Sequence, residues 1–343
     1  MAVTPGEWLS LMDAEYLAGF VPAGGSAVKF VVGCPDRLVA VADRLAGLAD
    51  RYGLLYVPID AAASRLHMIQ DVFFAVARRV DWEAAAQRLV EGMFERQAYR
   101  WPDPGYAAPI HRVAAANGID VTLLRREFRQ WLTAEIMQDH RMAQDFRIAM
   151  TQLCLSRLAP PRDPRPEDRQ PGGEGPVGPA AADEGQAAVV EPVLEWLRGD
   201  LRTLGMLRQH QINARITRHN ARAMLSSLCW WLRLCGTAGI VCVLDIRQLA
   251  RAGAAAGDAL RYSPAAVMDA FEVLRQVIDD AENFAGLFLA VLADDTFVEG
   301  DPKRSVEAYA ALKMRIWPDV HARGRDNPLA PLVRLGDRGH AGT

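Results

Sequence analysis

Two runs of continuous apolar residues constrain the fold of this chain more than any other feature. Ile240–Leu244 is followed at once by Asp245, and Leu287–Leu292 is followed, one residue later, by a polar turn. Strands that are apolar at every position are typical of a parallel sheet covered by helices on both faces. Each run is preceded by a segment with helical spacing. The sequence therefore predicts an α/β fold with a parallel sheet.

The N-terminal part repeats the alternation of strand and helix. Val28–Val32 is a short apolar strand, and Leu38–Tyr52 has apolar residues at helical spacing before Gly53, a residue that commonly ends helices. Leu54–Ile59 then predicts a second strand. A strand, a helix and a strand in this order indicate a right-handed parallel crossover. A short amphipathic helix over Trp8–Phe20 precedes this unit.

The sheet is predicted to be split by a large insertion. We expect helices from Ile69 to Leu158, and further helices over Val193–Leu207, Ala221–Leu234 and Ser263–Ala281. The segment 159–191 is rich in Pro and Gly and has few apolar side chains, which predicts a disordered linker. The expected organisation is a first part of the α/β domain at 1–80, a helical insertion at 81–158, the linker at 159–191, and helices with the second part of the α/β domain at 192–343.

Composition excludes some classes of protein. The chain has 343 residues, 50% of them hydrophobic, and a formal net charge of -3, which gives no general electrostatic reason to bind nucleic acid. Its apolar runs are far shorter than the roughly 20 residues of a membrane helix. The first residues carry Glu7, Asp13 and Glu15 and lack the basic start of a secretory signal. We therefore expect no membrane association and a cytoplasmic location.

Cysteine and histidine give no sign of a metal site or a disulfide framework. The five cysteines form no CxxC pair, and the seven histidines show no ligand spacing. We interpret Cys34, Cys154, Cys229, Cys235 and Cys242 as buried, reduced thiols.

Several short segments, taken in order, carry a family resemblance. They are Gly24–Gly33, Tyr56–Asp60, Arg65–His67, Asn220–Arg222 with Leu225 and Leu228, Gly239–Val241 and Tyr309–Ile316. In these segments the chain resembles the BREX-type ATP-binding proteins of phage-defence systems, relatives of the AAA+ ATPases. The resemblance implies a P-loop NTPase (AAA+-like) sheet interrupted by the helical insertion.

The chain departs from this family at the nucleotide-binding loop. A working P-loop has the pattern G-x-x-x-x-G-K-[ST], because backbone amides wrap the phosphates, Lys reaches them and Ser or Thr holds Mg²⁺. After Gly33 the chain reads Cys34-Pro35-Asp36-Arg37 and passes into the predicted helix. Pro35 removes an amide donor, and Asp36 adds a negative charge where phosphates would lie. Arg37 is a weak substitute for the missing Lys.

The acidic motif expected after the strand Ile240–Leu244 is also altered. The family pattern has Asp-Glu, whereas this chain has Asp245-Ile246, and Ile246 cannot activate water. Asp245 either helps to hold a metal or serves as a loop carboxylate that accepts hydrogen bonds. The segment Asp294–Thr296 is either a polar sensor of the γ-phosphate or a plain turn. Gly33, Arg37 and Asp245 are our candidates for a vestigial nucleotide site.

Basic residues offer a second group of candidates. Arg215, Arg218 and Arg222 cluster before the helix at 221–234, and Arg315 lies in the C-terminal segment of the resemblance. They are candidate contacts to a neighbouring subunit, as arginine fingers are, with a solvated basic helix start or internal salt bridges as the alternative. No metal site and no catalytic residue is predicted.

We therefore expect a pseudo-ATPase, without a required cofactor, that scaffolds or regulates an oligomeric anti-phage complex. Its expected partners are a paralogous P-loop ATPase and other defence-system proteins, with an indirect association with DNA. One alternative is a subunit that still binds ATP and Mg²⁺ at an altered site completed in trans. Another is a DNA-binding adaptor that uses the helical insertion, where Arg125, Arg126, Arg129 and Arg141 lie.

Overall fold

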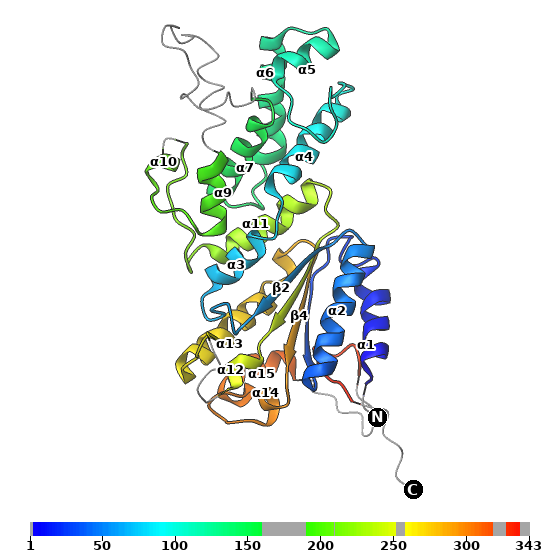
Figure 1. The fold of residues 1–343 in the computed structure, drawn as a ribbon, viewed down its shortest axis with the longest axis vertical. Coiled ribbons are helices and arrows are strands. Elements are labelled where there is room, and N and C mark those ends of the chain that lie inside the picture. Colours follow the sequence, from blue (N-terminus) through cyan, green and yellow to red (C-terminus); the bar gives the residue numbers. More distant parts are fainter. Residues whose placement is uncertain (1–2, 160–189, 209, 252–257, 318–326, 337–343) are drawn as a thin grey trace. The chain divides into compact units, whose positions relative to one another are not determined.

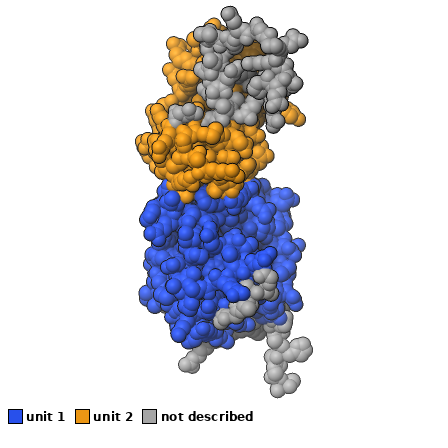
Figure 2. All heavy atoms as spheres, turned by 60° about the vertical axis from the view of Figure 1, so that its left-hand side comes forward, with its two compact units in different colours: residues 1–79, 217–233, 237–343 blue, residues 80–216, 234–236 orange. Residues whose placement is uncertain are grey.

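The computed structural model describes residues 3–159, 190–208, 210–251, 258–317 and 327–336, which form two compact units (Figures 1 and 2). Unit 1 comprises Met1–Arg79, Thr217–Arg233 and Thr237–Thr343, and unit 2 comprises Val80–Ile216 and Leu234–Gly236. The predicted linker at 159–191 lies almost wholly outside the described residues. Among the helices that the structure describes, none combines the length and the apolar character that crossing a bilayer requires.

Unit 1 is built on a five-stranded sheet with the order β2-β3-β4-β1-β5. The strands are β1 Ala27–Val32, β2 Leu55–Asp60, β3 Ile240–Asp245, β4 Leu287–Ala293 and β5 Leu332–Arg334. Every neighbouring pair is parallel. The predicted parallel sheet and four of its strands are therefore confirmed. β1 and β2 belong to the same sheet, but β3 and β4 lie between them.

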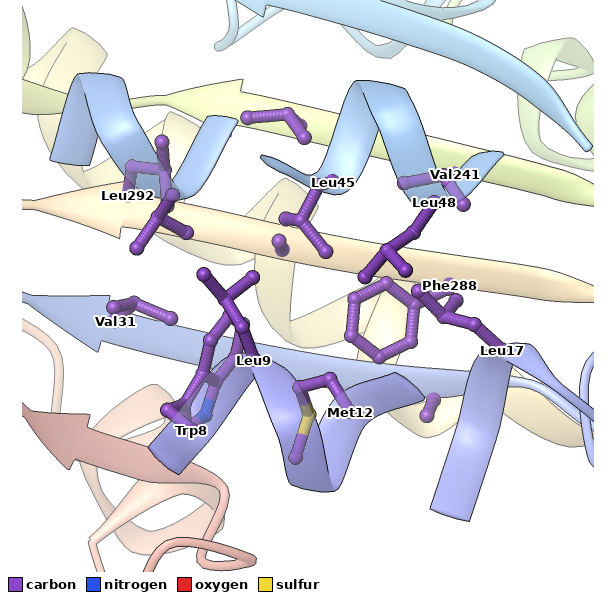
Figure 3. Close-up of a cluster of buried hydrophobic side chains, with 14 of the residues drawn as sticks. Trp8, Leu9, Met12, Leu17, Val31, Leu45, Leu48, Val241, Phe288 and Leu292 are labelled. Atoms are coloured by element: carbon purple, nitrogen blue, oxygen red, sulfur yellow. The ribbon is translucent and has the colours of Figure 1, made fainter. Parts of the chain in front are cut away.

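The first face of the sheet is covered by α1 Pro5–Met12, the π-helical turn η1 Asp13–Leu17 and α2 Pro35–Arg51. Figure 3 shows Trp8 and Met12 of α1 and Leu45 of α2 in one buried cluster with Val241 of β3 and Phe288 of β4. These strand residues face the same side because side chains alternate between the two faces of a sheet. Burial of this cluster fixes both helices on the strands.

The second face is covered by α3 Ile69–Ala77, α11 Ala221–Leu234 and α13 Pro264–Asp279. Here Cys242 and Leu289, which alternate with the residues of the first face, meet Val76, Leu225 and Val277 around a small apolar pocket. α15 Ala310–Ile316 packs beside α13. Shorter elements complete the unit, namely α12 Arg247–Ala250, η4 Ala281–Asn283, α14 Thr296–Glu299 and η5 Val306–Ala308.

Unit 2 is helical in the part of the chain that the structure describes. Its elements are α4 Trp82–Arg96, α5 Ile110–Asn117, α6 Val121–Leu132, the π-helical turn η2 Thr133–Met137, α7 Gln144–Ser156, α9 Val190–Arg198 and α10 Gly205–Arg208. α7 packs against both α4 and α9. The ring of Phe94 in α4 contacts Trp101, Phe128 and Trp131, so aromatic packing joins α4 to α6.

Some predicted boundaries are wrong for identifiable reasons. The single helix expected at Val193–Leu207 is two helices, because Gly199 adopts a positive φ of 81° after α9. The first helix starts at Pro5, since Thr4 and Glu7 form a capping box, and its regular part ends at Met12. α9 and α10 belong to unit 2, whereas they were expected with the second part of the α/β domain.

A pair of methionines provides a test of the first-face core. Met12 is fully buried in the cluster, whereas Met314 on α15 is 72% exposed. We expect Met12→Ala to lower the free energy of unfolding by about 2–5 kcal/mol, because it removes buried methylenes and leaves a cavity. The matched variant Met314→Ala should cost less than about 0.5 kcal/mol. Urea unfolding followed by circular dichroism measures both, and equal losses would contradict the packing.

Candidate functional site

The carboxyl edge of the sheet is where a ligand site is expected. Ligands of open parallel sheets bind beyond the carboxyl ends of the strands, where adjacent strands lead to opposite faces. β1 and β4 are such a pair, because β1 leads to α2 on the first face and β4 leads to α15, which packs beside α13 on the second. The register pairs Val32 with Ala293 and Leu292 with Asp245, so the ends of β1, β4 and β3 are level.

The loop after β1 is short and its amides are largely used within the protein. Only Gly33 and Cys34 separate β1 from α2, which begins at Pro35. The Gly33 amide donates to the Ala293 carbonyl at 3.1 Å, continuing the sheet, and the Arg37 amide donates to the Cys34 carbonyl at 3.1 Å. Pro35 has no amide hydrogen. The Gly33, Pro35 and Arg37 positions therefore supply no amide for a phosphate, whereas a P-loop wraps phosphates with several consecutive amides.

The prediction that all five cysteines are buried is wrong for Cys34. This thiol is exposed, because Cys34 is the N-cap residue of α2 at the edge of the sheet. The other four cysteines are buried as predicted, and desolvation raises the pKa of the Cys229 and Cys242 thiols to about 12. A raised pKa keeps a thiol protonated and unreactive.

The segment after β5 covers the carboxyl end of β1. The Leu335 amide donates to the Val32 carbonyl at 2.8 Å, and a Cβ placed on Gly33 would lie 3.5 Å from the Cβ of Leu335. The guanidinium of Arg37 donates to the Leu335 carbonyl at 3.3 Å. Arg37, the proposed substitute for a phosphate-binding Lys, therefore contacts the chain's own backbone.

Asp245 forms a local ion pair at the end of β3. Its carboxylate accepts from the Arg247 amide at 3.1 Å and from Nε of the same residue at 2.9 and 3.0 Å. The hydrogen bonds that Arg247 donates to Asp245 raise the pKa of Arg247, and the charges of Asp294 and Asp60 raise it further. The guanidinium thus lies among the carboxylates that end β2, β3 and β4. The neighbouring Ile246 is buried at 2% exposure.

The polar segment after β4 forms a turn that leads into a short helix. The Asp294 carboxylate accepts hydrogen bonds from the amide and the hydroxyl of Thr296, the first residue of α14. This is the geometry of a residue that initiates a turn. Asp294 contributes its charge to the surroundings of Arg247, but its hydrogen bonds lie within its own turn.

Taken together, the groups at this edge do not fit a nucleoside triphosphate with Mg²⁺. Phosphate oxygens need a glycine-rich loop of amides and a Lys, whereas this edge has a Gly33 amide bonded to Ala293, the exposed Asp36 and an Arg37 bound to Leu335. Mg²⁺ needs free carboxylate oxygens, whereas those of Asp245 hold Arg247. Within the described residues no group of three or more His, Cys, Asp and Glu could hold a metal ion.

The structure brings together two of the four arginines proposed as subunit contacts, Arg222 and Arg315, which bind consecutive carboxylates at the end of α13. Arg215, in unit 2, donates to the Arg202 carbonyl, and Arg218 is exposed. Arg222 pairs with Asp280 at 2.7 Å, and Arg315 pairs with Asp279 at 2.9 Å. For these last two residues the structure has the internal salt bridges that were the alternative.

Arg222 and Arg315 lie at the opposite edge of the sheet from the candidate nucleotide site. Their partners end α13, which leads through η4 to the start of β4. A six-residue strand such as β3 spans about 20 Å, at roughly 3.3 Å per residue. Neither arginine can reach the carboxyl edge of its own sheet.

The C-terminal half of α13 carries a charged network that was not predicted from the sequence. The carboxylate of Glu272 accepts from Arg275 at 2.6 Å and from the Tyr309 hydroxyl at 2.5 Å. Arg275 also pairs with Asp279, which links Glu272 to Arg315. The hydrogen bond from Arg275 is the main reason that the pKa of Glu272 falls to about 2. The spacing of three and four residues between these groups on one helix was the signal available.

Arg247 and Tyr262 were also missed as residues that organise the carboxyl edge. Tyr262 belongs to none of the sequence motifs, yet its hydroxyl donates to the Ser64 carbonyl at 2.5 Å and accepts from the Leu66 amide at 3.3 Å. It thereby fixes the loop after β2. Only the i, i+2 spacing of Asp245 and Arg247 was visible in the sequence.

The network at Glu272 predicts a dependence of stability on pH. Because folding lowers the pKa of this carboxyl from 4.5 to about 2, its stabilising contribution is complete above 4.5 and is lost as the pH falls towards 2. We expect Glu272→Gln to lower the urea midpoint at neutral pH and to flatten its decline in that interval. The control Glu282→Gln, at an exposed position, should leave the midpoint nearly unchanged. Parallel curves for wild type and Glu272→Gln would contradict the network.

Comparison with known proteins identifies a family in the C-terminal half of the chain. The model of the BREX system ATP-binding protein BrxC/D family matches residues 179–338, which include β3, β4 and β5. The segments of the resemblance at Gly24–Gly33 and Tyr56–His67 lie outside the match. No curated protein and no solved structure matches the chain. The resemblance to the BREX-type ATP-binding proteins is therefore confirmed, and residues 179–338 carry the family's pattern.

Proposed function

We propose that this protein is a non-catalytic subunit of a BREX-type phage-defence system, in which it scaffolds or regulates an assembly with an active ATPase relative. The observation that carries the proposal is the loop after β1. Two residues connect β1 to α2, the Gly33 amide is bonded to Ala293, and Pro35 starts the helix. A triphosphate would find neither the glycine amides nor the Lys of a P-loop there, and binding at the Gly33 amide would break its bond to Ala293.

The occupied carboxylate of Asp245 supports the same proposal. In a working ATPase of this kind the acidic residue after the third strand helps to hold Mg²⁺, and a Glu beside it activates water. Here Arg247 supplies a positive charge from within the chain, and the neighbour is the buried Ile246. A permanent guanidinium neutralises the carboxylates without any ligand.

The fold we propose for unit 1 is a degenerate AAA+-like P-loop domain. Its support is the single parallel sheet, in which the loops after β1 and β3 lie on either side of the loop after β4. The family match supplies the relationship to ATP-binding proteins, and it covers β3, β4 and β5 without β1.

The proposed partner is a P-loop-intact relative, and the proposed contact residue is Arg218. This side chain is exposed, whereas Arg222 and Arg315 already hold Asp280 and Asp279. An exposed arginine next to the start of α11 can reach an acidic or phosphate group on a neighbouring subunit. Arg222 and Arg315 would act indirectly, by fixing the end of α13.

The first expected outcome concerns nucleotide binding. Titration of the full chain with Mg-ATP to millimolar concentration should give no saturable heat, and the melting temperature should not rise. A ligand present at about 100 times its Kd would stabilise the folded state by about 2.7 kcal/mol, which a melting curve detects. A P-loop-intact relative serves as the positive control. Saturable binding that is lost in Arg37→Ala would overturn the proposal in favour of an altered nucleotide site.

The second expected outcome concerns assembly. The protein should co-purify with a P-loop-intact relative at micromolar concentration, and Arg218→Glu should weaken the complex about tenfold, about 1.4 kcal/mol. The matched charge reversal Arg44→Glu, at an exposed position on α2, should have no effect. Analytical ultracentrifugation measures both. Absence of a complex with wild type would contradict the scaffolding role, and equal effects of the two reversals would contradict the contact at Arg218.

A further inference from the structure

Helices α5 and α6 in unit 2 form a helix-turn-helix. α5 ends at Asn117, and a three-residue turn, Gly118 to Asp120, leads to α6 at Val121. Gly118 has φ 64° and ψ 32°, the left-handed conformation that suits glycine. The Asp120 carboxylate then caps α6 by accepting from the Leu123 amide at 3.0 Å. A turn of three or four residues containing Gly between two helices is the feature that defines this motif.

The inner faces of the two helices fix which side of α6 points outward. Val113 and Ala114 of α5 and Leu124 and Phe128 of α6 are buried, and the two helices pack against each other (Figure 1). The ring of Phe128 lies 5.5 Å from that of Phe94 in α4. Since Leu124 and Phe128 are four residues apart, they define one face of the helix, and the opposite face is directed away from this core.

The outward face of α6 is polar and basic. Thr122, Arg126, Arg129 and Gln130 are exposed and recur at the spacing of one helical face. Neither Arg126 nor Arg129 forms an ion pair with any residue that the structure describes. Glu127, the acidic residue of this helix, accepts from the Tyr99 hydroxyl at 3.0 Å. The charge of the exposed face is therefore positive.

The local charge differs from that of the whole chain. Residues 110–132 contain four arginines and two acidic residues, whereas the full sequence carries a net charge of -3. Of the arginines singled out in the sequence, Arg125, Arg126 and Arg129 lie on α6. Arg141 lies outside the motif and holds Asp139 at 2.8 Å. The basic character is thus concentrated on the second helix, the one that enters the groove in DNA-binding helix-turn-helix proteins.

We propose that α5 and α6 bind duplex DNA, with α6 in the major groove. The N-terminal part of the second helix contacts base edges in this motif, which places Thr122 and Arg126 towards the bases and Arg129 towards a phosphate. The major groove is about 12 Å wide and admits one α-helix. This activity goes beyond the proposed scaffolding role, because it gives the subunit its own contact with DNA.

The test measures binding of the full chain to a fluorescent 30-base-pair duplex of mixed sequence by anisotropy, at several salt concentrations. The double variant Arg126→Gln/Arg129→Gln should weaken binding at least tenfold and should lower the slope of log K against log salt by about one, because the phosphate contact of Arg129 is lost at about 0.9 per contact. The control Arg202→Gln/Arg208→Gln removes the same charge from exposed positions of unit 2 outside the motif. It should leave both quantities unchanged.

Other outcomes would overturn the proposal. The proposal is wrong if wild type does not bind the duplex at micromolar protein in low salt. It is also wrong if the two double variants lose affinity equally, or if Arg126→Gln/Arg129→Gln binds as wild type does. Stronger binding to single-stranded DNA or RNA than to the duplex would also contradict a helix in the major groove. Far-UV circular dichroism and melting curves check that both double variants remain folded.

Discussion

The burial of β4 on both faces is the constraint on which the rest of unit 1 depends. Every residue of this strand is buried, and β1 and β3 flank it in parallel register. The apolar side chains on both faces of such a central strand can be buried only when helices cover both sides of the sheet. Because the strands run in one direction, their carboxyl ends meet at one edge. The position of the candidate site is therefore a consequence of the packing.

At that edge the chain satisfies its polar groups with its own residues. Arg247 neutralises Asp245, the guanidinium of Arg37 donates to the Leu335 carbonyl, and the Gly33 amide donates to the Ala293 carbonyl. Each of these contacts pairs a polar group at this edge with another group of the same chain.

The sequence was most informative where apolar residues form continuous runs. Ile240–Leu244 and Leu287–Leu292 predicted the central strands, and Asp245 was correctly placed at the end of one. β5 was not predicted, because its pairing with β1 depends on contacts between distant parts of the chain and three residues give no periodic signal. The partners of Arg247 and Arg315 were not predicted either. A long side chain can reach several neighbours, and the folded backbone decides which of them it binds.

The contact between Val3 and Leu335 has a topological consequence. The two residues form a parallel bridge, and the Gly336 amide donates to the Val3 carbonyl at 3.0 Å. Hydrogen bonds beside β1 thus join the first and the last described segments of unit 1. A circular permutation that linked these two segments covalently would move the start of the chain and would leave the lateral order of the strands unchanged.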